Sequence, residues 1–531
     1  MRAFSSLAVS ILSTAVKPAV AMFYYPSPAA SALEHILVDN WGAYASNFSS
    51  AITPCENYVT EVGLPAINSR RTTSAQWLRV AFHDFATADI AAGTGGLDAS
   101  IGFETEREEN SGTAFNDSFI FWQPFVNEFV PMADLLAVGT VMSVHICGGK
   151  YIPYQYGRVD ATTADPKTGV PAPDTTLEKT LTQFQQTGFN QSDAIALTAC
   201  GHTMGSVHAG GFPTVVEESA ITPNNTNGAV NLDGTRAVFD SAVVHEYIDN
   251  TGQRGGPLVT SFNESSRSDL RLYESDGNKT MLDLYAQGDG FQDTCVDLLG
   301  RMLNTVPAGV QLQPAIEPAL IKPINVTWDI TDDSQLVLSG KIRVLYTGEV
   351  SDNPISITFS NGYTETLVPE EDLGISAFKL SNSQTNATTQ YSPFSISGSS
   401  LSGASSFSVA ATGIETQTFQ IQDKAFIAPS LTHIADGTVS VTVAARTNQT
   451  DLDPSKLSLK VATPIAQPLT LAPKIVQSDV QLEGAASPLE NIGYWTGSIA
   501  IEEPTGAVSV SLLSGEDVID TLLLDAGVAG W

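Results

Sequence analysis

Residues 76–84 read QWLRVAFHD and are the most informative part of the first half of the chain. No Gly or Pro occurs between Ser74 and Phe85, which predicts a helix. Arg79 and His83 are four residues apart, so a helix places both side chains on one face. A cation beside an imidazole suits cleavage of a peroxide O–O bond, because a base must move a proton while a positive charge stabilises the departing oxygen.

A loop rich in oxygen ligands follows this helix. Residues 95–100 read GGLDAS. The carboxylates of Asp84 and Asp98, the hydroxyl of Ser100 and the carbonyl of Gly96 form a set of oxygen atoms. Hard cations such as calcium prefer ligands of this kind. The loop therefore predicts a calcium site close to the helix that carries His83.

A second histidine lies in residues 196–205, which read ALTACGHTMG. Ser192 and Asp193 are predicted to cap and begin a helix that runs to His202. Taken in this order, the stretches resemble the R-x-x-F-H-D, G-x-D-x-S and proximal motifs of the plant-type haem peroxidase superfamily. The resemblance implies a mainly α-helical domain that binds haem b, with His202 as the axial ligand of the iron and Phe82 beside the cofactor.

Further segments match single positions of that family. Asn110 follows Glu104 by six residues, like the Asn that accepts the Nδ1–H of the distal imidazole. Residues 268–272 resemble the segment whose Asp, here Asp269, bonds the proximal imidazole and increases its negative charge. Residues 233–240 repeat the spacing of the proximal calcium loop of secreted members. The second calcium site implied by the resemblance consists of Thr203, Asp233, Thr235, the carbonyl of Val238, and Asp240.

The resemblance covers about residues 50–305 and is greatest to secreted fungal members. Thr72 and Gln76 occupy the positions of the acids that bind manganese in manganese-oxidising members. Leu197 replaces the exposed Trp of lignin-oxidising members, and Leu232 excludes a tryptophan radical. Three other histidines match no functional position and are interpreted as packing or surface residues: His145, His208 and His245. We therefore expect a peroxidase that reduces hydrogen peroxide and oxidises small organic donors at the haem edge.

The pattern changes after about Pro318. Residues 341–346 (KIRVLY) and 438–443 (TVSVTV) alternate or cluster β-branched residues, and turn residues separate such segments. A spacing of roughly 10 residues between strands predicts one large antiparallel sandwich or two small ones. A Ser-, Thr- and Asn-rich patch over residues 380–408 is predicted to be a long loop or a break between two sandwiches. The expected organisation is a signal peptide over 1–21, a haem peroxidase domain over 22–310, a linker over 311–323 and a β-rich region over 324–531.

The beginning of the chain predicts export. Residues 1–21 contain one arginine, an apolar run and a small-x-small cleavage pattern, as signal peptides do. The four cysteines, Cys55, Cys147, Cys200 and Cys295, are compatible with two disulfides in any of three pairings. A disulfide at Cys200 would be unusual, because this residue lies in the predicted proximal helix. Nine N-x-S/T sequons also favour a secreted glycoprotein: Asn47, Asn116, Asn190, Asn224, Asn263, Asn278, Asn325, Asn386 and Asn448.

The composition restricts the partners. The chain of 531 residues has 57 acidic and 25 basic side chains, which gives a net charge of −32. This balance excludes nucleic acid as an expected partner, because phosphate binding needs a basic face. No segment after the signal peptide reaches ~18 consecutive apolar residues, so no transmembrane segment is expected. The β-rich region is either a stabilising spacer or a module that attaches to cell-wall polysaccharide, with Trp328 and Trp495 as candidates for stacking on sugars. The alternative function is therefore a catalytically weak cell-wall-binding or adhesive protein built on a peroxidase fold.

Overall fold

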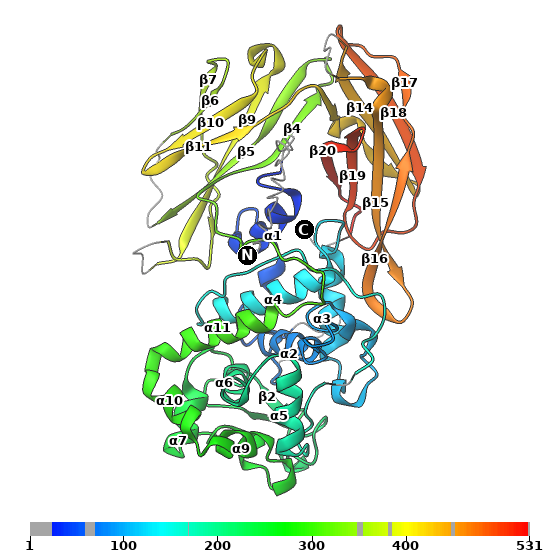
Figure 1. The fold of residues 1–531 in the computed structure, drawn as a ribbon. Helices are drawn as coiled ribbons and strands as arrows, with labels where there is room; N and C mark the ends of the chain where they lie inside the picture. The colour runs from blue at the N-terminus through cyan, green and yellow to red at the C-terminus, as the bar shows by residue number, and fades with distance from the viewer. Residues whose placement is uncertain are drawn as a thin grey trace, which may run out of the picture.

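Helices form the first half of the chain and antiparallel sheets form the second half, as predicted (Figure 1). The expected signal peptide and the sequon at Asn448 lie outside the described residues. No helix in the described part of the chain is long and apolar enough to cross a membrane. The computed structural model describes residues 24–58, 69–167, 169–347, 354–380, 385–447 and 452–528.

The two predicted helices that carry histidines are present. The distal helix begins at Thr73 and ends at Phe85. The proximal helix begins one residue after Asn190, because Asn190 and Asp193 form a capping box there rather than Ser192 acting as the cap. The helices are α1 (Pro28–Val38), α2 (Thr73–Phe85), α3 (Ala114–Trp122), α4 (Met132–Ile146), α5 (Leu177–Gln186), α6 (Gln191–Gly201), α7 (Ala242–Asp249), α8 (Pro257–Thr260), α9 (Ser268–Tyr273), α10 (Lys279–Gln287) and α11 (Phe291–Leu303).

The first sandwich packs two sheets around a core that includes Trp328, Phe394 and Phe407. Its sheets have the strand orders β1-β8-β9-β5-β4 and β11-β10-β6-β7. The described part of the patch over residues 380–408, which begins again at residue 385, is neither a long loop nor a break, because β9 lies within it and pairs with β5 along its whole length. The strands are β1 (Trp41–Gly42), β4 (Ile321–Ile330), β5 (Leu336–Thr347), β6 (Ile355–Phe359), β7 (Thr364–Leu367), β8 (Gly374–Ile375), β9 (Ala387–Ser397), β10 (Ser406–Ala411) and β11 (Ile414–Gln420).

The second sandwich has its own core, which includes Val441, Leu459 and Val510. Its sheets have the orders β12-β14-β18-β17, with β13 also paired to β14, and β16-β15-β19-β20. The strands are β12 (Ala425–Ile427), β13 (His433–Ala435), β14 (Thr438–Arg446), β15 (Leu457–Gln467), β16 (Thr470–Val480), β17 (Glu483–Ala485), β18 (Ile492–Ala500), β19 (Val508–Ser514) and β20 (Asp517–Leu524). In the helical half, β2 (Ser206–His208) and β3 (Ala229–Asn231) form a short hairpin.

Buried charges join the helical half to the first sandwich. Glu34 on α1 accepts from Lys322 and Arg343 at 2.6 Å each. Arg343 also donates to Asp39 at 3.0 Å, and the hydroxyl of Tyr391 donates to the other oxygen of Asp39 at 2.9 Å. All five residues are buried. Breaking such a buried pair is costly, so α1 holds the first sandwich firmly.

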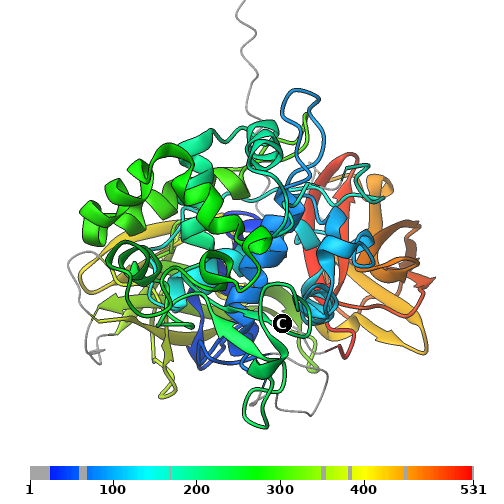
Figure 2. The same ribbon diagram turned by 90° about the horizontal axis from the view of Figure 1, so that it is seen from below.

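The second sandwich contacts the helical half through β16 and β19. The side chain of Gln123 donates to the carbonyl of Leu471 at 3.0 Å. Glu128 accepts from Gln477 at 2.8 Å and from Ser509 at 2.6 Å. Seen from the helical end, the yellow strands of the first sandwich and the orange and red strands of the second lie on opposite sides (Figure 2). Both sandwiches are therefore attached directly to the helical half.

Two disulfides brace the helical half. They join Cys55 to Cys147 and Cys200 to Cys295. The expected number of disulfides is confirmed. The disulfide at Cys200, which is unusual for a residue in the proximal helix, forms because α11 lies beside α6 and brings Cys295 to it.

Candidate active site

The distal side of the site is on α2. Arg79 and His83 lie one turn apart near the end of this helix, as their spacing predicts. The ring of Phe115, on α3, lies 4.9 Å from the Arg79 guanidinium carbon and 5.2 Å from the His83 ring centroid. Phe115 therefore packs against both side chains. This contact could not be predicted from residue spacing, because Phe115 belongs to a different helix.

A hydrogen bond fixes the tautomer of His83. Its Nδ1 lies 2.7 Å from Asn110 Oδ1, and Asn110 Nδ2 donates to the carbonyl of Glu104 at 2.9 Å. Since the amide nitrogen already donates to Glu104, the amide oxygen faces the imidazole, and Nδ1 carries the proton. Nε2 is then a free base. Burial, and after it the charge of Arg79, lower the pKa of His83 to about 3, so the imidazole is neutral over the ordinary pH range.

Backbone carbonyls hold the distal guanidinium in place. Arg79 donates through Nη2 to the carbonyl of Glu109 at 3.3 Å and to that of Ser111 at 3.5 Å. Burial, and after it the charge of Arg71, lower the pKa of Arg79 to about 10. The side chain is therefore still a cation at neutral pH. No carboxylate among the described residues forms an ion pair with Arg79, so its charge is available to an anion.

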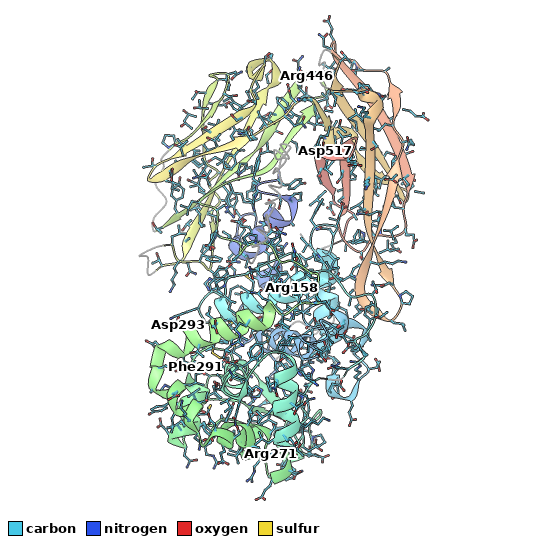
Figure 3. All side chains as sticks on the ribbon, viewed as in Figure 1. Arg158, Arg271, Phe291, Asp293, Arg446 and Asp517 are labelled. Carbon is cyan, nitrogen blue, oxygen red and sulfur yellow. A yellow bond between two sulfur atoms is a disulfide. The ribbon has the colours of Figure 1, made fainter. Side chains whose placement is uncertain are left out.

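The proximal side of the site is at the end of α6. His202 directly follows this helix, and its Nδ1–H donates to Asp269 Oδ2 on α9 at 2.7 Å. Burial alone would lower the pKa of His202, but the charge and the hydrogen bond of Asp269 outweigh it and raise the pKa. Arg271 holds α9 by donating to the carbonyls of Pro173 and Thr175, and it lies at the end of the helical half remote from the sandwiches (Figure 3).

His208, which the sequence analysis interpreted as a packing or surface residue, lies within range of the charge of Arg79. It lies on β2, and its Nε2 is buried without a hydrogen-bond partner among the described residues. Burial, and after it the charges of Arg71, Arg79 and Arg236, lower its pKa to about 4. Three cations therefore act on this imidazole in a strongly acidic protein. Its position six residues after His202 was visible, but the arginines come from distant segments.

The structure brings the predicted distal oxygen ligands together. Asp84 accepts from the backbone of Asp98 at 3.0 Å and from the hydroxyl of Ser100 at 3.3 Å. Asp165, which the sequence analysis missed, accepts from the same hydroxyl at 3.3 Å. Burial, and after it the neighbouring carboxylates, raise the pKa of Asp84 and bring that of Asp98 to about 6. No basic side chain forms an ion pair with these three carboxylates in the described residues. Gly96 lies in the same loop, with its N–H 3.4 Å from the hydroxyl of Thr87.

Three members of the second predicted oxygen set also lie close together. The hydroxyl of Thr235 lies 3.3 Å from Asp233 Oδ1 and 3.2 Å from Asp240 Oδ1. Asp233 Oδ2 is buried without a partner among the described residues. Thr203 is buried beside the end of α6, and Val238 shares the loop of Asp233 and Asp240. Among the described residues, no three carboxylate, imidazole or thiolate groups are arranged so that they could hold a metal ion alone, so hydroxyl and carbonyl oxygens would have to complete each set.

Phe82 belongs to α2 and packs against α5. Its ring is 6.0 Å from that of Phe184, and both rings line a small cavity. A groove of about 600 Å³ elsewhere, beside α11, is lined by Arg301 and Asn304 among others and contains no predicted site residue. The site is therefore defined by its side-chain geometry and not by that groove.

Comparison with known proteins finds a family match within the helical half. A family model described as Peroxidase matches residues 59–288, which contain both histidines and all the predicted ligands. These residues form a peroxidase-family domain. The β-rich region lies outside the match.

Relatives of the peroxidase domain come from fungi and plants. A WSC domain-containing protein of Arthroderma benhamiae is 37% identical over 317 residues, or 59% of this chain and 42% of that protein. This alignment is longer than the β-rich region and so includes part of the helical half. Putative L-ascorbate peroxidase 6 of Arabidopsis thaliana is 35% identical over 27% of this chain and 44% of its own. Peroxidase 22.3 of Oryza sativa is 28% identical over 44% of this chain and 78% of its own. The chain covers less than half the length of the first two.

Proposed function

We propose that this protein is a secreted haem peroxidase that reduces hydrogen peroxide and oxidises small organic donors at the haem edge. The observation that carries the proposal is the pair of histidines held through Nδ1. His83 is bonded to Asn110 and His202 to Asp269, so each imidazole keeps Nε2 outside any hydrogen bond among the described residues. One Nε2 is then free to accept a proton, and the other is free to bind a metal.

The residues present fit haem b. His202 Nε2 would hold the iron, since an imidazole bonded to a carboxylate is a stronger ligand. The unpartnered Nε2 of His208 and the cation of Arg236 suit the two carboxylates that haem carries. Phe82 would pack beside the ring. When bound, haem supplies a redox-active iron at which peroxide is reduced by two electrons.

The chain's own residues would move the protons. His83 Nε2 accepts a proton from one peroxide oxygen and returns it to the oxygen that departs as water. Arg79 stabilises the negative charge on that oxygen, and the carbonyls of Glu109 and Ser111 keep the guanidinium in place. Asn110 keeps the proton of His83 on Nδ1, so that Nε2 begins each cycle as a base.

Two calcium ions would neutralise the buried carboxylates. The proximal set has the stronger support, because Asp233 Oδ2 is buried and unpartnered. The distal set is supported by three carboxylates without a basic partner in the described residues. Thr203 follows His202 and Asp84 follows His83, so each ion would brace one histidine. Elemental analysis should find two calcium ions per chain, and chelation should slow peroxide reduction before the fold melts.

We propose that the β-rich region braces the peroxidase domain. The buried Glu34 and Arg343 pair supports this role. Stacking on polysaccharide has less support, because Trp328 is buried and donates to the carbonyl of Gln422 at 2.7 Å. A chain that ends at residue 310 should unfold at lower temperature than the full chain. A truncated chain of unchanged stability would remove the bracing role.

One spectrum tests the enzymatic proposal. The full chain, expressed with ample haem, should show a Soret band that shifts when hydrogen peroxide is added and returns when a phenolic donor follows. A colourless protein, or a Soret band that does not respond to peroxide, would contradict the proposal and leave the alternative of a catalytically weak cell-wall-binding protein.

A further inference from the structure

The proximal histidine sits on the last turn of a helix that is tied to a second helix. His202 donates its backbone N–H to the carbonyl of Thr198 at 3.0 Å, and Thr203 donates its hydroxyl to the carbonyl of Cys200 at 3.2 Å. Cys200 therefore belongs to the turn that presents the imidazole. Cys200 is joined to Cys295 on α11, and both residues are completely buried.

The helix α11 is attached to α6 at two matched points. Arg301 near its end donates to Asp193 near the beginning of α6 at 3.1 Å, and Cys295 near its beginning is bonded to Cys200. The helices are thus antiparallel. At 1.5 Å per residue the two attachments are about 10 Å apart along α6 and about 9 Å apart along α11, so they agree in register. Figure 3 labels Phe291 and Asp293 at the beginning of α11.

The end of α6 is buried toward the core and open at one point of its surface. Leu197, Ala199 and Cys200 are buried, whereas a Cβ added to Gly201 would meet no heavy atom within 4 Å. Ala199 and Gly201 contribute few side-chain atoms to the packing of the last turn. The bond at Cys200 therefore adds a covalent constraint on the position of this turn along the helix axis.

We propose that the Cys200–Cys295 disulfide positions His202 by holding the last turn of α6 in register with α11. This inference rests on the proposed function, in which His202 Nε2 binds the haem iron. Cys200 and Cys295 are then positioning residues: they touch neither cofactor nor substrate and act through the helix. Asp269 sets the rotation of the imidazole, whereas the disulfide sets the position of its backbone.

The second disulfide of the chain is a matched control. Cys55 and Cys147 are 92 residues apart, and Cys200 and Cys295 are 95 residues apart. The stabilisation that a disulfide gives through loop closure depends on the logarithm of loop length, so the two bonds should stabilise the fold about equally. Only one of them lies on the helix that presents His202. A difference between the two deletions at the haem therefore reports positioning and not stability.

The experiment compares the holoprotein with Cys200→Ala/Cys295→Ala and with Cys55→Ala/Cys147→Ala. Chemical denaturation measures stability, and three measurements report the ligand: the ferric Soret spectrum, the iron reduction potential, and the rate of haem transfer to apomyoglobin. Both variants should lose similar stability. Only Cys200→Ala/Cys295→Ala should change the spectrum and the potential, and it should release haem roughly tenfold faster or more, as expected when the support of a metal ligand is removed.

A rescue experiment separates positioning from general loosening. In His202→Gly with added imidazole, the ligand is no longer attached to α6. Removing the Cys200–Cys295 bond in that background should then leave the spectrum and the potential unchanged. If Cys200→Ala/Cys295→Ala does not fold, Cys200→Ala/Cys295→Val restores most of the lost volume and receives the same measurements.

The outcomes distinguish this inference from the proposed function. A wild-type chain that binds no haem contradicts the proposed function itself. A wild-type chain with a normal Soret band and peroxide response, combined with equal spectra and potentials in both disulfide variants, overturns only the positioning role. A spectral change from Cys200→Ala/Cys295→Ala that persists in the His202→Gly background also overturns it.

Discussion

The distal and proximal histidines make the same hydrogen bond to acceptors of different charge. His83 and His202 each use Nδ1, and each bond is 2.7 Å long. The acceptor of His83 is the neutral amide of Asn110, whereas the acceptor of His202 is the carboxylate of Asp269. The pKa of His83 falls to about 3, and the pKa of His202 rises. The charge of the acceptor therefore separates the pKa values of two imidazoles that burial alone would shift in the same direction.

The surroundings reinforce this difference. Burial lowers the pKa of both imidazoles. On the distal side the positive charge of Arg79 lowers the pKa of His83 further, so His83 stays neutral and able to accept a proton. On the proximal side Asp269 reverses the effect of burial, so His202 carries more negative charge toward any metal it binds. Each partner is fixed by its own neighbours: Asn110 by the carbonyl of Glu104, and Asp269 by its place on α9.

The largest effect is expected from removing the proximal imidazole. His202→Ala should abolish stable haem binding, because it removes the proposed axial ligand of the iron. Absorption at the Soret band after gel filtration measures the bound haem. His245→Ala is a matched control, because that imidazole packs against Tyr285 away from the site. Full retention of haem by His202→Ala would contradict the assignment of the axial ligand.

Removing the distal imidazole should affect the rate and spare the cofactor. His83→Leu should slow the reaction with peroxide by roughly 10²–10⁴-fold, the usual contribution of a positioned acid–base group. Arg79→Leu should cost less, and both variants should still bind haem. Stopped-flow absorption at the Soret band under excess peroxide measures the rate, with His245→Leu as the control. A rate for His83→Leu within about tenfold of wild type would contradict the role of His83.

The sequence predicted the parts of the site that lie close together in the chain. The four-residue spacing of Arg79 and His83 required only a helix, and the composition around residues 76–84 indicated one. The change to β-branched segments after Pro318 predicted the antiparallel sheets. Asn110 and Asp269 could be proposed only through the resemblance, because the chain must fold before either residue meets its histidine.

Other features depend on contacts between distant segments, and the sequence did not reveal them. Phe115 supports Arg79 and His83 from another helix. Asp165 reaches Ser100 from a loop that carries no motif. Cys200 and Cys295 are 95 residues apart, and the bond between them depends on the antiparallel packing of two helices. Local patterns carry no information on such packing, which the hydrophobic core of the whole domain determines.

Replacing the carboxylate that accepts from His202 should reduce the difference between the pKa values of the two histidines. Asp269→Asn keeps a hydrogen bond to His202 but removes the charge, so burial should then lower the pKa of His202. The iron reduction potential should rise, and haem affinity should fall by about 10–100-fold, as is typical for partners of metal ligands. A potentiometric titration at the Soret band measures the potential. Asp249→Asn, at the surface beside Tyr285, is the control. An unchanged potential in Asp269→Asn would remove Asp269 from this role.

The smallest effect at neutral pH, and the most specific, should come from charging the distal acceptor. Asn110→Asp places a carboxylate at 2.7 Å from Nδ1 of His83, where the amide lies now. A neighbouring opposite charge favours the imidazolium and should raise the pKa of His83 by roughly 1–3 units from about 3. Asn304→Asp, which adds the same charge at the end of α11, is the control.

The sign of the pH dependence follows from the proton that His83 must accept. Only neutral His83 is a base, so the wild-type rate should stay constant as the pH falls until it approaches about 3. In Asn110→Asp this decline should begin at higher pH, so the rate at pH 4 should fall severalfold while the rate at pH 7 changes little. His83 also links stability to pH. Between pH 6.5, the ordinary pKa of histidine, and about pH 3, the imidazole of His83 binds a proton in the unfolded wild type but not in the folded wild type. His83 therefore destabilises the folded wild type progressively as the pH falls through this window, and Asn110→Asp should reduce that loss. Identical pH profiles of rate and stability in wild type and Asn110→Asp would show that the acceptor does not control His83.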